Sequence, residues 1–169
     1  MEFIVLHRYS GEVVNIKKFD CGEQSFNDFL CDNHDLIADG YNVGVAIHYI
    51  IEPESKGLIG YIALSASAVY YEDDKGRLGR NHAIYINRFA IDLKYQKQGL
   101  AKRILEKVLE EDIKMYAYEF VGAKWVVLNA VANDVVMSLY KDIGFEEIGR
   151  SYESEVEPNC IAMFREIIW

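Results

Sequence analysis

The sequence lacks the features that usually mark secreted, membrane and metal proteins. Its three cysteines are odd in number and widely spaced, which argues against a disulfide framework. No charged segment followed by an apolar core opens the chain, and no apolar run approaches the roughly 20 residues that a bilayer span needs. The four histidines are scattered without ligand spacing, so we expect no metal. We therefore expect a cytoplasmic protein that does not enter a membrane.

Positive charge is scarce overall but unevenly placed. Against 27 acidic residues the chain has 18 lysines and arginines, and this net charge of -9 argues against a nucleic-acid partner. Between Lys75 and Lys107, however, nine basic residues stand against two acidic ones, a local balance of +7 that leaves -16 for the rest. Such a concentration around a glycine-containing turn predicts a site for a compact polyanion. The alternative is a basic face exposed to solvent.

Apolar periodicity predicts alternating strands and helices in one domain over residues 1–169. Helices are expected in the FDCGEQSFNDFL stretch, from residue 100 onward, and over 133–143, where Gly144 would end the last one. The acidic stretch YEDDKGRLGR, residues 71–80, has the composition of a loop. Strands are expected at 2–8, 43–51, 57–69, 82–91 and 125–130, with a final hairpin from 147–150 and 160–168. The order of elements implies a parallel strand-helix-strand unit at residues 82–130.

The segment YQKQGLAKRIL, residues 95–105, lies where such units bind ligands, between a strand and the start of the next helix. Amides in the first turn of a helix have no intrahelical partner, and the helix dipole favours an anion there. Gly99 would let the backbone approach a phosphate closely. Neither GxxxxGK[ST] nor GxGxxG occurs in the chain. An ordinary turn between a strand and a helix is the alternative.

Two motifs resemble those of one enzyme family. The run NRFAIDLKYQKQGLAKRIL resembles the coenzyme-A-binding motif of the GNAT superfamily of N-acetyltransferases, whose core [QR]xxGx[GA] is met by Gln96, Gly99 and Ala101. The run NDVVMSLYKDIGF is similar to the family's NxxAxxLYxxxGF, with Val136 in place of the alanine. Order and separation match the family. The resemblance implies a single-domain GNAT fold of the α/β (α+β mixed) class, with a central mixed sheet of six to seven strands flanked by helices.

The resemblance also implies a site for acetyl-CoA. In the family the pyrophosphate lies on the amides of the turn, and the pantetheine arm lies along the preceding strand like an added strand, bonded here to the backbone of Phe89 and Ile91. Lys97, Lys102 and Arg103 would add positive charge. A free amine attacks the thioester directly, and a backbone N–H of the same strand stabilises the oxyanion. The cofactor-binding residues implied are Phe89, Ala90, Ile91, Gln96, Lys97, Gln98, Gly99, Leu100, Ala101, Lys102 and Asn133.

Tyr140 matches the family's tyrosine, which protonates the departing thiolate. A phenol with a pKa of about 10 stays protonated where a thiol with a pKa of roughly 8.5 ionises. The alternative is a core tyrosine, since Val136 and Tyr140 share a helix face. Asn133 is an N-cap residue by type, and the family's asparagine also contacts the coenzyme. Residues 82–91 hold no carboxylate, so we expect a water relay as general base, with Glu52 or His82 as other candidates.

A narrower resemblance concerns the acceptor. The stretch FDCGEQSFNDFL resembles the start of a GNAT subgroup that includes toxins acetylating aminoacyl-tRNA, and NRFAID resembles their GRLAVD. Those toxins tend to be basic, whereas residues 19–39 contain six acidic residues and no lysine or arginine. In the family the first helix borders the acceptor site, so an acidic helix favours a cationic amine or a basic partner. A solvated helix face is the alternative.

Three functions therefore stay open. The first is N-acetylation of a primary amine on a small molecule or a protein, and the second is a toxin that acetylates charged tRNA and has an antitoxin. The third is a coenzyme-A-binding module without catalysis. Tyr140 disfavours the third function, and the acidic segment disfavours the second. We also expect a homodimer.

Overall fold

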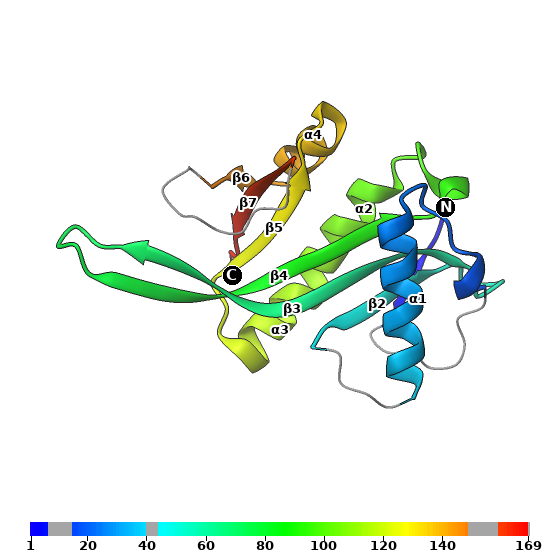
Figure 1. Ribbon diagram of the computed structural model, residues 1–169, viewed down its shortest axis with the longest axis horizontal. Coiled ribbons are helices and arrows are strands. Elements are labelled where there is room, and N and C mark those ends of the chain that lie inside the picture. Colours follow the sequence, from blue (N-terminus) through cyan, green and yellow to red (C-terminus); the bar gives the residue numbers. More distant parts are fainter. Residues whose placement is uncertain (7–14, 40–43, 149–158, 169) are drawn as a thin grey trace. The chain divides into compact units, whose positions relative to one another are not determined.

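The computed structural model describes residues 1–6, 15–39, 44–148 and 159–168. Its strands form a seven-stranded sheet in the order β1-β2-β3-β4-β5-β7-β6, in which β4 and β5 are parallel. This confirms the expected mixed sheet flanked by helices (Figure 1). The chain divides into two compact units, Met1–Ser65 with Asn87–Ile104 and Ala66–Ile86 with Leu105–Trp169, which are described in turn.

The first unit contains helix α1, Gln24–Ala38, and the strands that precede and follow it. Strand β1 (Ile4–Leu6) pairs with β2 (Ala46–Ile51), and β2 pairs with the first part of β3 (Leu58–Glu72), both in antiparallel fashion. Tyr61 of β3 is fully buried, and its hydroxyl donates to the carbonyl oxygen of Phe26 at 2.8 Å. Because its ring is buried and its hydroxyl is hydrogen-bonded to the first turn of α1, Tyr61 holds the start of that helix in place.

The second unit is built around β5, Trp125–Val131. It pairs in parallel with β4 (Leu78–Ile91) and antiparallel with β7 (Cys160–Glu166), which in turn pairs with the short β6 (Glu146–Glu147). Val126, Leu128 and Ala130 are buried, as the apolar run predicted. The helical segments are α2 (Leu100–Lys107), which begins in the first unit, η3 (Val108–Ile113), α3 (Lys114–Tyr116), η4 (Ala117–Val121) and α4 (Asp134–Asp142).

Most expected elements are present, and one expectation is wrong. Half of the stretch 71–80 is strand, because β3 continues to Glu72 and β4 begins at Leu78. Only the turn between them remains, closed by the N–H of Asp73, which donates to the carbonyl oxygen of Arg77. A pair of strands exposed to solvent carries many polar residues, so its composition resembles that of a loop. The end of the expected strand at 7–8 lies outside the described residues, as do 149–150.

No helix within the described ranges combines the length and the apolar character that crossing a bilayer requires.

Candidate active site

The turn between β4 and α2 has an unusual backbone. After β4 ends at Ile91, the short helix η2 (Leu93–Tyr95) leads to Lys97 with φ +59° and Gly99 with φ +72°, and α2 begins at Leu100. A Cβ atom added to Gly99 would have no heavy atom within 4 Å. Gly99 is therefore required by the left-handed conformation, and the space above it is open to a ligand.

The turn offers backbone donors. Within the described part of the chain, no residue accepts from the N–H groups of Lys97 to Ala101. The first turn of α2 also holds no acidic side chain that would compete for them. Unpartnered amides at a helix start favour an anion, so the turn fits the pyrophosphate of a coenzyme.

A set of hydrogen bonds braces this turn against the loop before α1. The side-chain amide of Gln96 donates to the carbonyl oxygens of Cys21 at 2.9 Å and Ile91 at 2.8 Å. The carboxylate of Asp92 accepts from the N–H of Asp20 at 3.2 Å and from that of Lys94 at 3.0 Å. Gln96 thus positions the turn through its side chain, while its own N–H donates to the carbonyl oxygen of Leu93 at 3.4 Å.

Asp20 and Asp92 were not among the predicted site residues. Asp92 is only 5% exposed, although aspartate is seldom buried, and Asp20 accepts from the N–H of Gly22 and the side chain of Asn27. One signal in the sequence was available: an aspartate directly after an apolar strand and before a turn is a common capping residue. Nothing in the sequence indicates that the backbone of Asp20, 72 residues earlier, donates to this carboxylate.

The edge of β4 fits an added strand. The N–H of Asp92 donates to the carbonyl oxygen of Ile59 on β3, and successive residues of a strand present their N–H groups to opposite edges. The N–H groups of Ile91 and Phe89 therefore point away from β3, while Ala90 belongs to the core beneath α1. The pairing with β5 ends at Ile86, five residues before β4 ends. The predicted backbone bonds of Phe89 and Ile91 thus have a free edge on which to form, and they stay a prediction.

The positive charge is less concentrated at the turn than expected. Arg103 donates to the carbonyl oxygen of Met1 at 3.1 Å and lies over the ring of Phe3, and Lys107 pairs with Glu111 at 2.7 Å. Arg88 lies 5.1 Å and 5.6 Å from the ring centres of Phe26 and Phe29. Of the nine basic residues in this segment, Lys94 and Lys97 lie between β4 and α2, and Lys102 lies in the first turn of α2.

Helix α4 carries the other two predicted site residues. Asn133 caps it, because its side-chain oxygen accepts from the N–H groups of Val135 at 3.0 Å and Val136 at 3.1 Å. The amide nitrogen of this exposed side chain remains available for a ligand. Two helical turns on, Tyr140 is 9% exposed, and its ring packs edge-on against Phe145 at 5.6 Å.

The hydroxyl of Tyr140 suits a proton donor. No described residue hydrogen-bonds to it, and burial raises the pKa of Tyr140 to about 12. The group therefore stays protonated at neutral pH. The hydroxyl oxygen is not among the fully buried side-chain atoms of the described residues that lack a hydrogen-bond partner, so it keeps some access to solvent, where water or a ligand can meet it. Tyr140 can therefore both pack in the core and donate a proton from its hydroxyl.

Two other features bear on the chemistry. The general-base candidates belong to different units: Glu52 accepts from Ser55 in the turn between β2 and β3 of the first unit, and His82 is exposed on β4 in the second unit. Among the described residues, no three His, Cys, Asp or Glu side chains gather as metal ligands would.

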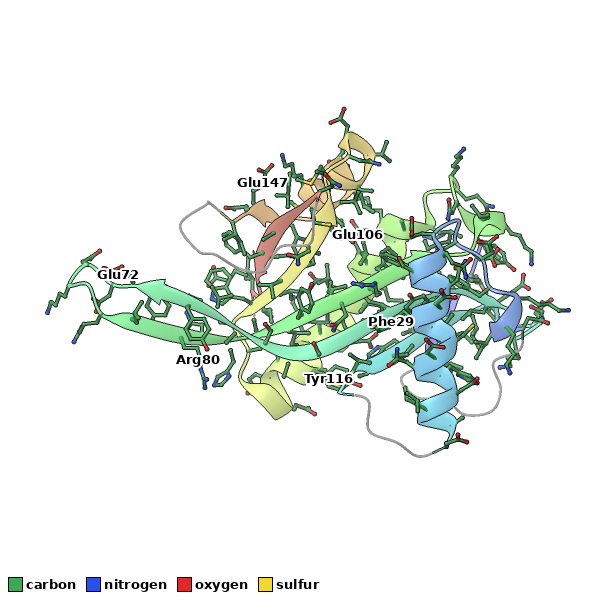
Figure 2. All side chains as sticks on the ribbon, in the orientation of Figure 1. Phe29, Glu72, Arg80, Glu106, Tyr116 and Glu147 are labelled. Atoms are coloured by element: carbon green, nitrogen blue, oxygen red, sulfur yellow. The ribbon has the colours of Figure 1, made fainter. Side chains whose placement is uncertain are left out.

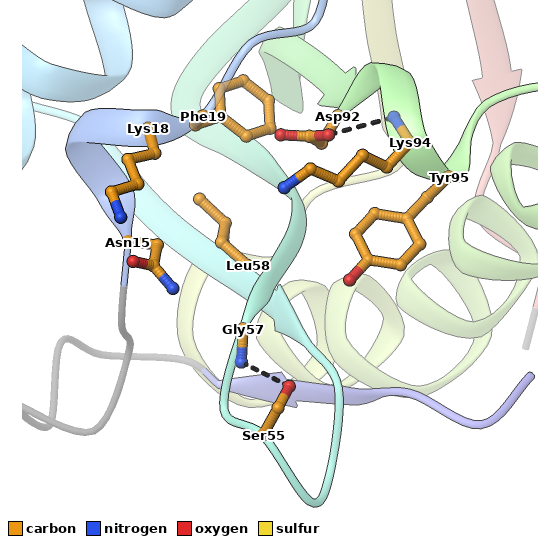
Figure 3. Close-up of a pocket in the computed structure, with 9 residues that line it drawn as sticks. All are labelled: Asn15, Lys18, Phe19, Ser55, Gly57, Leu58, Asp92, Lys94 and Tyr95. Atoms are coloured by element: carbon orange, nitrogen blue, oxygen red, sulfur yellow. Dashed lines mark hydrogen bonds between the residues drawn. The ribbon is translucent and has the colours of Figure 1, made fainter.

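The first unit also contains a pocket of about 260 Å³ next to η2 (Figure 3). Lys18 and Lys94 extend into it above Leu58. The lining residues are Asn15, Lys18, Phe19, Ser55, Gly57, Leu58, Asp92, Lys94 and Tyr95. Since none of the residues predicted to bind acetyl-CoA is in this set, we do not place the coenzyme in this pocket.

The acidic residues of α1 are exposed. Asp28, Asp32 and Asp35 of α1, and Asp39 at its C-terminal end, all face solvent, and within the described ranges only Asp35 lies near a cation, Lys17, at 3.9 Å. Such a surface pair contributes little, so the negative potential of the helix is largely uncompensated.

The two hydrogen bonds of the Gln96 side chain to the carbonyl oxygens of Cys21 and Ile91, which we call the brace, lead to a testable prediction. Replacing Gln96 by methionine keeps the length of the side chain but removes both hydrogen bonds, so the free energy of unfolding should fall by about 1–2 kcal/mol. The acetyl-CoA affinity should weaken with it, because the turn loses its support. Gln24→Met is the matched control, since Gln24 lies outside the turn and its side chain makes one exposed bond to Asp28. Urea unfolding and calorimetry measure both quantities, and an unchanged affinity in Gln96→Met would remove Gln96 from the site.

Comparisons with known proteins bear on the family and the fold. Residues 44–147 match the family model described as an acetyltransferase (GNAT) domain. A spermine/spermidine N(1)-acetyltransferase of Bacillus subtilis (strain 168) is 28% identical over 90 residues, which is 53% of this chain and 53% of that protein. The chain thus covers about half the length of that relative.

Solved structures of toxins share the fold. One is a tyrosine-to-phenylalanine mutant of AtaT bound to the C-terminus of the antitoxin AtaR and to acetyl-CoA, with a TM-score of 0.71 at 18% identity over 99% of this chain and 94% of that one. Another is AtaT complexed with acetyl-methionyl-tRNAfMet, with a TM-score of 0.72 at 19% identity over 95% of this chain and 94% of the other. The family model covers more than half of the sequence, and the chain belongs to the GNAT family of acetyltransferases.

Proposed function

We propose that residues 1–169 act as one N-acetyltransferase domain in the cytoplasm, transferring an acetyl group from acetyl-CoA to a primary amine. The observation that carries this proposal is the braced turn, whose N–H groups from Lys97 to Ala101 have no acceptor among the described residues. When bound, acetyl-CoA supplies the acetyl thioester. Three free cysteines fit a reducing compartment.

The residues have separate tasks. The amides of Lys97, Gly99 and Ala101 bind the pyrophosphate, with Lys102 adding charge, and the N–H groups of Phe89 and Ile91 hold the pantetheine arm. Tyr140 donates a proton to the leaving thiolate, and water accepts the proton of the attacking amine. No covalent bond to the protein forms in this sequence.

The acceptor we propose is a cationic amine. The exposed carboxylates of α1 attract a polycation, and the curated relative is named for acetylating spermine and spermidine. The second candidate is the α-amino group of an aminoacyl-tRNA, which the likeness to AtaT supports. Against it stands the net charge of -9, which opposes binding to phosphate backbones. In that second case the chain would also have an antitoxin partner.

The test is release of free coenzyme A, measured by a thiol reagent, with spermidine, a monoamine such as butylamine, and methionyl-tRNA as acceptors. We expect the highest kcat/KM for spermidine, with rising salt reducing it more than for butylamine because charge attraction is screened. Highest activity on methionyl-tRNA would instead assign the second candidate. No thiol release with any amine, despite acetyl-CoA binding, would contradict the proposed activity.

A further inference from the structure

The pocket beside η2 is built from three separate segments of the first unit (Figure 3). One wall is the short helix η1 (Ile16–Lys18) with the residues that flank it, the second is the turn between β2 and β3, and the third is η2. Phe19 and Leu58 are buried and give the pocket an apolar base. Its volume of about 260 Å³ compares with about 30 Å³ for one water molecule. The pocket therefore has room for a small organic molecule but not for a nucleotide or a peptide.

The pocket is separate from the proposed coenzyme site. It lies on the β3 side of the end of β4, because the N–H of Asp92 donates to the carbonyl oxygen of Ile59 and Leu58 of the same strand lines the pocket. The N–H groups of Phe89 and Ile91, which we assign to the pantetheine arm, point to the opposite edge of β4. A ligand in the pocket and acetyl-CoA would thus lie on different sides of β4.

The pocket is also separate from the acidic helix next to which we place the acceptor. Helix α1 contributes none of the lining residues. Its Phe29, labelled in Figure 2, stacks on the ring of Tyr61 and lies 5.6 Å from the guanidinium group of Arg88. None of these three residues lines the pocket. The function proposed above therefore leaves the pocket without a ligand.

The charged side chains of the lining favour an anion. Lys18 and Lys94 reach into the same space from two different walls, and neither ammonium group pairs with a carboxylate of a described residue. The third charged residue is Asp92, whose two oxygens accept from the backbone N–H groups of Asp20 and Lys94. Two lysines and one aspartate give the lining a net charge of +1. A ligand with one negative charge balances it.

Two uncharged polar groups of the lining can also donate to an anion. Asn15 precedes η1 with φ +68°, and its side chain makes no capping hydrogen bond, so its amide group can turn to a ligand. Burial, together with the charges of Glu52 and Asp92, raises the pKa of Tyr95. The Tyr95 hydroxyl therefore stays protonated at neutral pH and can donate a hydrogen bond.

We propose that this pocket binds a small organic acid, with its carboxylate held by Lys18 and Lys94 and its apolar chain on Phe19 and Leu58. A carboxylate has two oxygens and can accept a charge-assisted hydrogen bond from each ammonium group. An inorganic anion would leave the apolar base of the pocket uncovered, and an alcohol would leave both ammonium groups without a counter-charge. A straight-chain acid of about six carbons satisfies both parts of the lining within the volume.

The test is titration of the ¹⁵N-labelled full chain with hexanoate, followed by amide chemical shifts in the absence of acetyl-CoA. We expect a dissociation constant of about 1 mM, and at least about 10-fold weaker binding of 1-hexanol and of inorganic phosphate. Lys18→Met and Lys94→Met should each weaken hexanoate at least about 10-fold, because each loses one charge-assisted bond. Lys17→Met is the matched control and should bind hexanoate normally, since Lys17 is a neighbour on η1 that pairs with Asp35 and does not line the pocket.

A second titration, with saturating acetyl-CoA present, separates this pocket from the coenzyme site. The affinity for hexanoate should not fall, and displacement of hexanoate by acetyl-CoA would overturn the proposal. Four other results would also overturn it: no binding of hexanoate up to about 20 mM, equal affinity for hexanol or phosphate, normal binding by either lining variant, or the same loss in Lys17→Met. Because the first titration needs no coenzyme, a failure of the proposed acetyltransferase activity would leave its result standing.

Discussion

Tyr140→Phe should turn over about 10²-fold more slowly than the wild type, while its affinity for acetyl-CoA changes little. The mutation keeps the ring that packs against Phe145 and removes only the hydroxyl, which has no partner among the described residues. Initial rates of coenzyme A release, measured with a thiol reagent, give the turnover number, and calorimetry gives the affinity for acetyl-CoA. A folded mutant with full turnover would leave water as the proton source and Tyr140 as a packing residue.

The same mutant has a second, independent signature. Because burial raises the pKa of Tyr140 to about 12, the folded state holds this proton above the unfolded pKa of about 10. The resulting stability is complete below pH 10 and is lost as the pH rises through 12; the full loss, reached above pH 12, is about 3 kcal/mol. Tyr140→Phe should lack this part of the alkaline loss. Urea unfolding at pH 9 and pH 11.5 measures it, and identical pH dependence in both proteins would contradict the burial of the hydroxyl.

Gly99→Val should weaken the binding of acetyl-CoA at least about 100-fold. Valine at φ +72° is strained by roughly 1–3 kcal/mol, so the turn must move and its amides with it. The open space around Gly99 means that this loss does not arise from a clash within the free protein.

Gly122→Val separates strain from binding. Gly122 has φ +61° and, like Gly99, no heavy atom within 4 Å of an added Cβ, but it ends η4, far along the chain from the turn. Both variants should lose similar stability, and only Gly99→Val should lose acetyl-CoA affinity. Equal affinities in the two variants would mean that the coenzyme does not use this turn.

Much of the fold could be predicted because its periodicity is strong. The buried strand β5 and the capped helix α4 follow directly from the apolar run after Trp125 and from Asn133. The extension of β3 and β4 beyond the strands that pair with them could not be predicted, because the polar composition of residues 71–80 is that of a turn. Only the contact of Tyr71 with Gly79, made across the two strands, distinguishes it.

The site shows the same limit. Gln96 and Gly99 were found from the motif, yet the motif does not say that Gln96 bonds to Cys21, 75 residues earlier. The positive charge along residues 75–107 indicated an anion site but not that Arg103 is held by the carbonyl oxygen of Met1. The sequence motif and the charge pattern identify which residues are close to the turn along the chain. Tertiary contacts decide which of them are available to a ligand.

The bonds from Gln96 and Asp92 to the loop before α1 also limit how such a protein can evolve. In the function that we propose, helix α1 borders the acceptor, so selection for a new acceptor would act on residues close in sequence to Asp20 and Cys21. Any change that shifts their backbone is transmitted to the turn, and the affinity for the cosubstrate changes as a side effect. We expect acceptor variants obtained by directed evolution to carry compensating changes at Leu93 or Lys94, beside the brace rather than beside the amine.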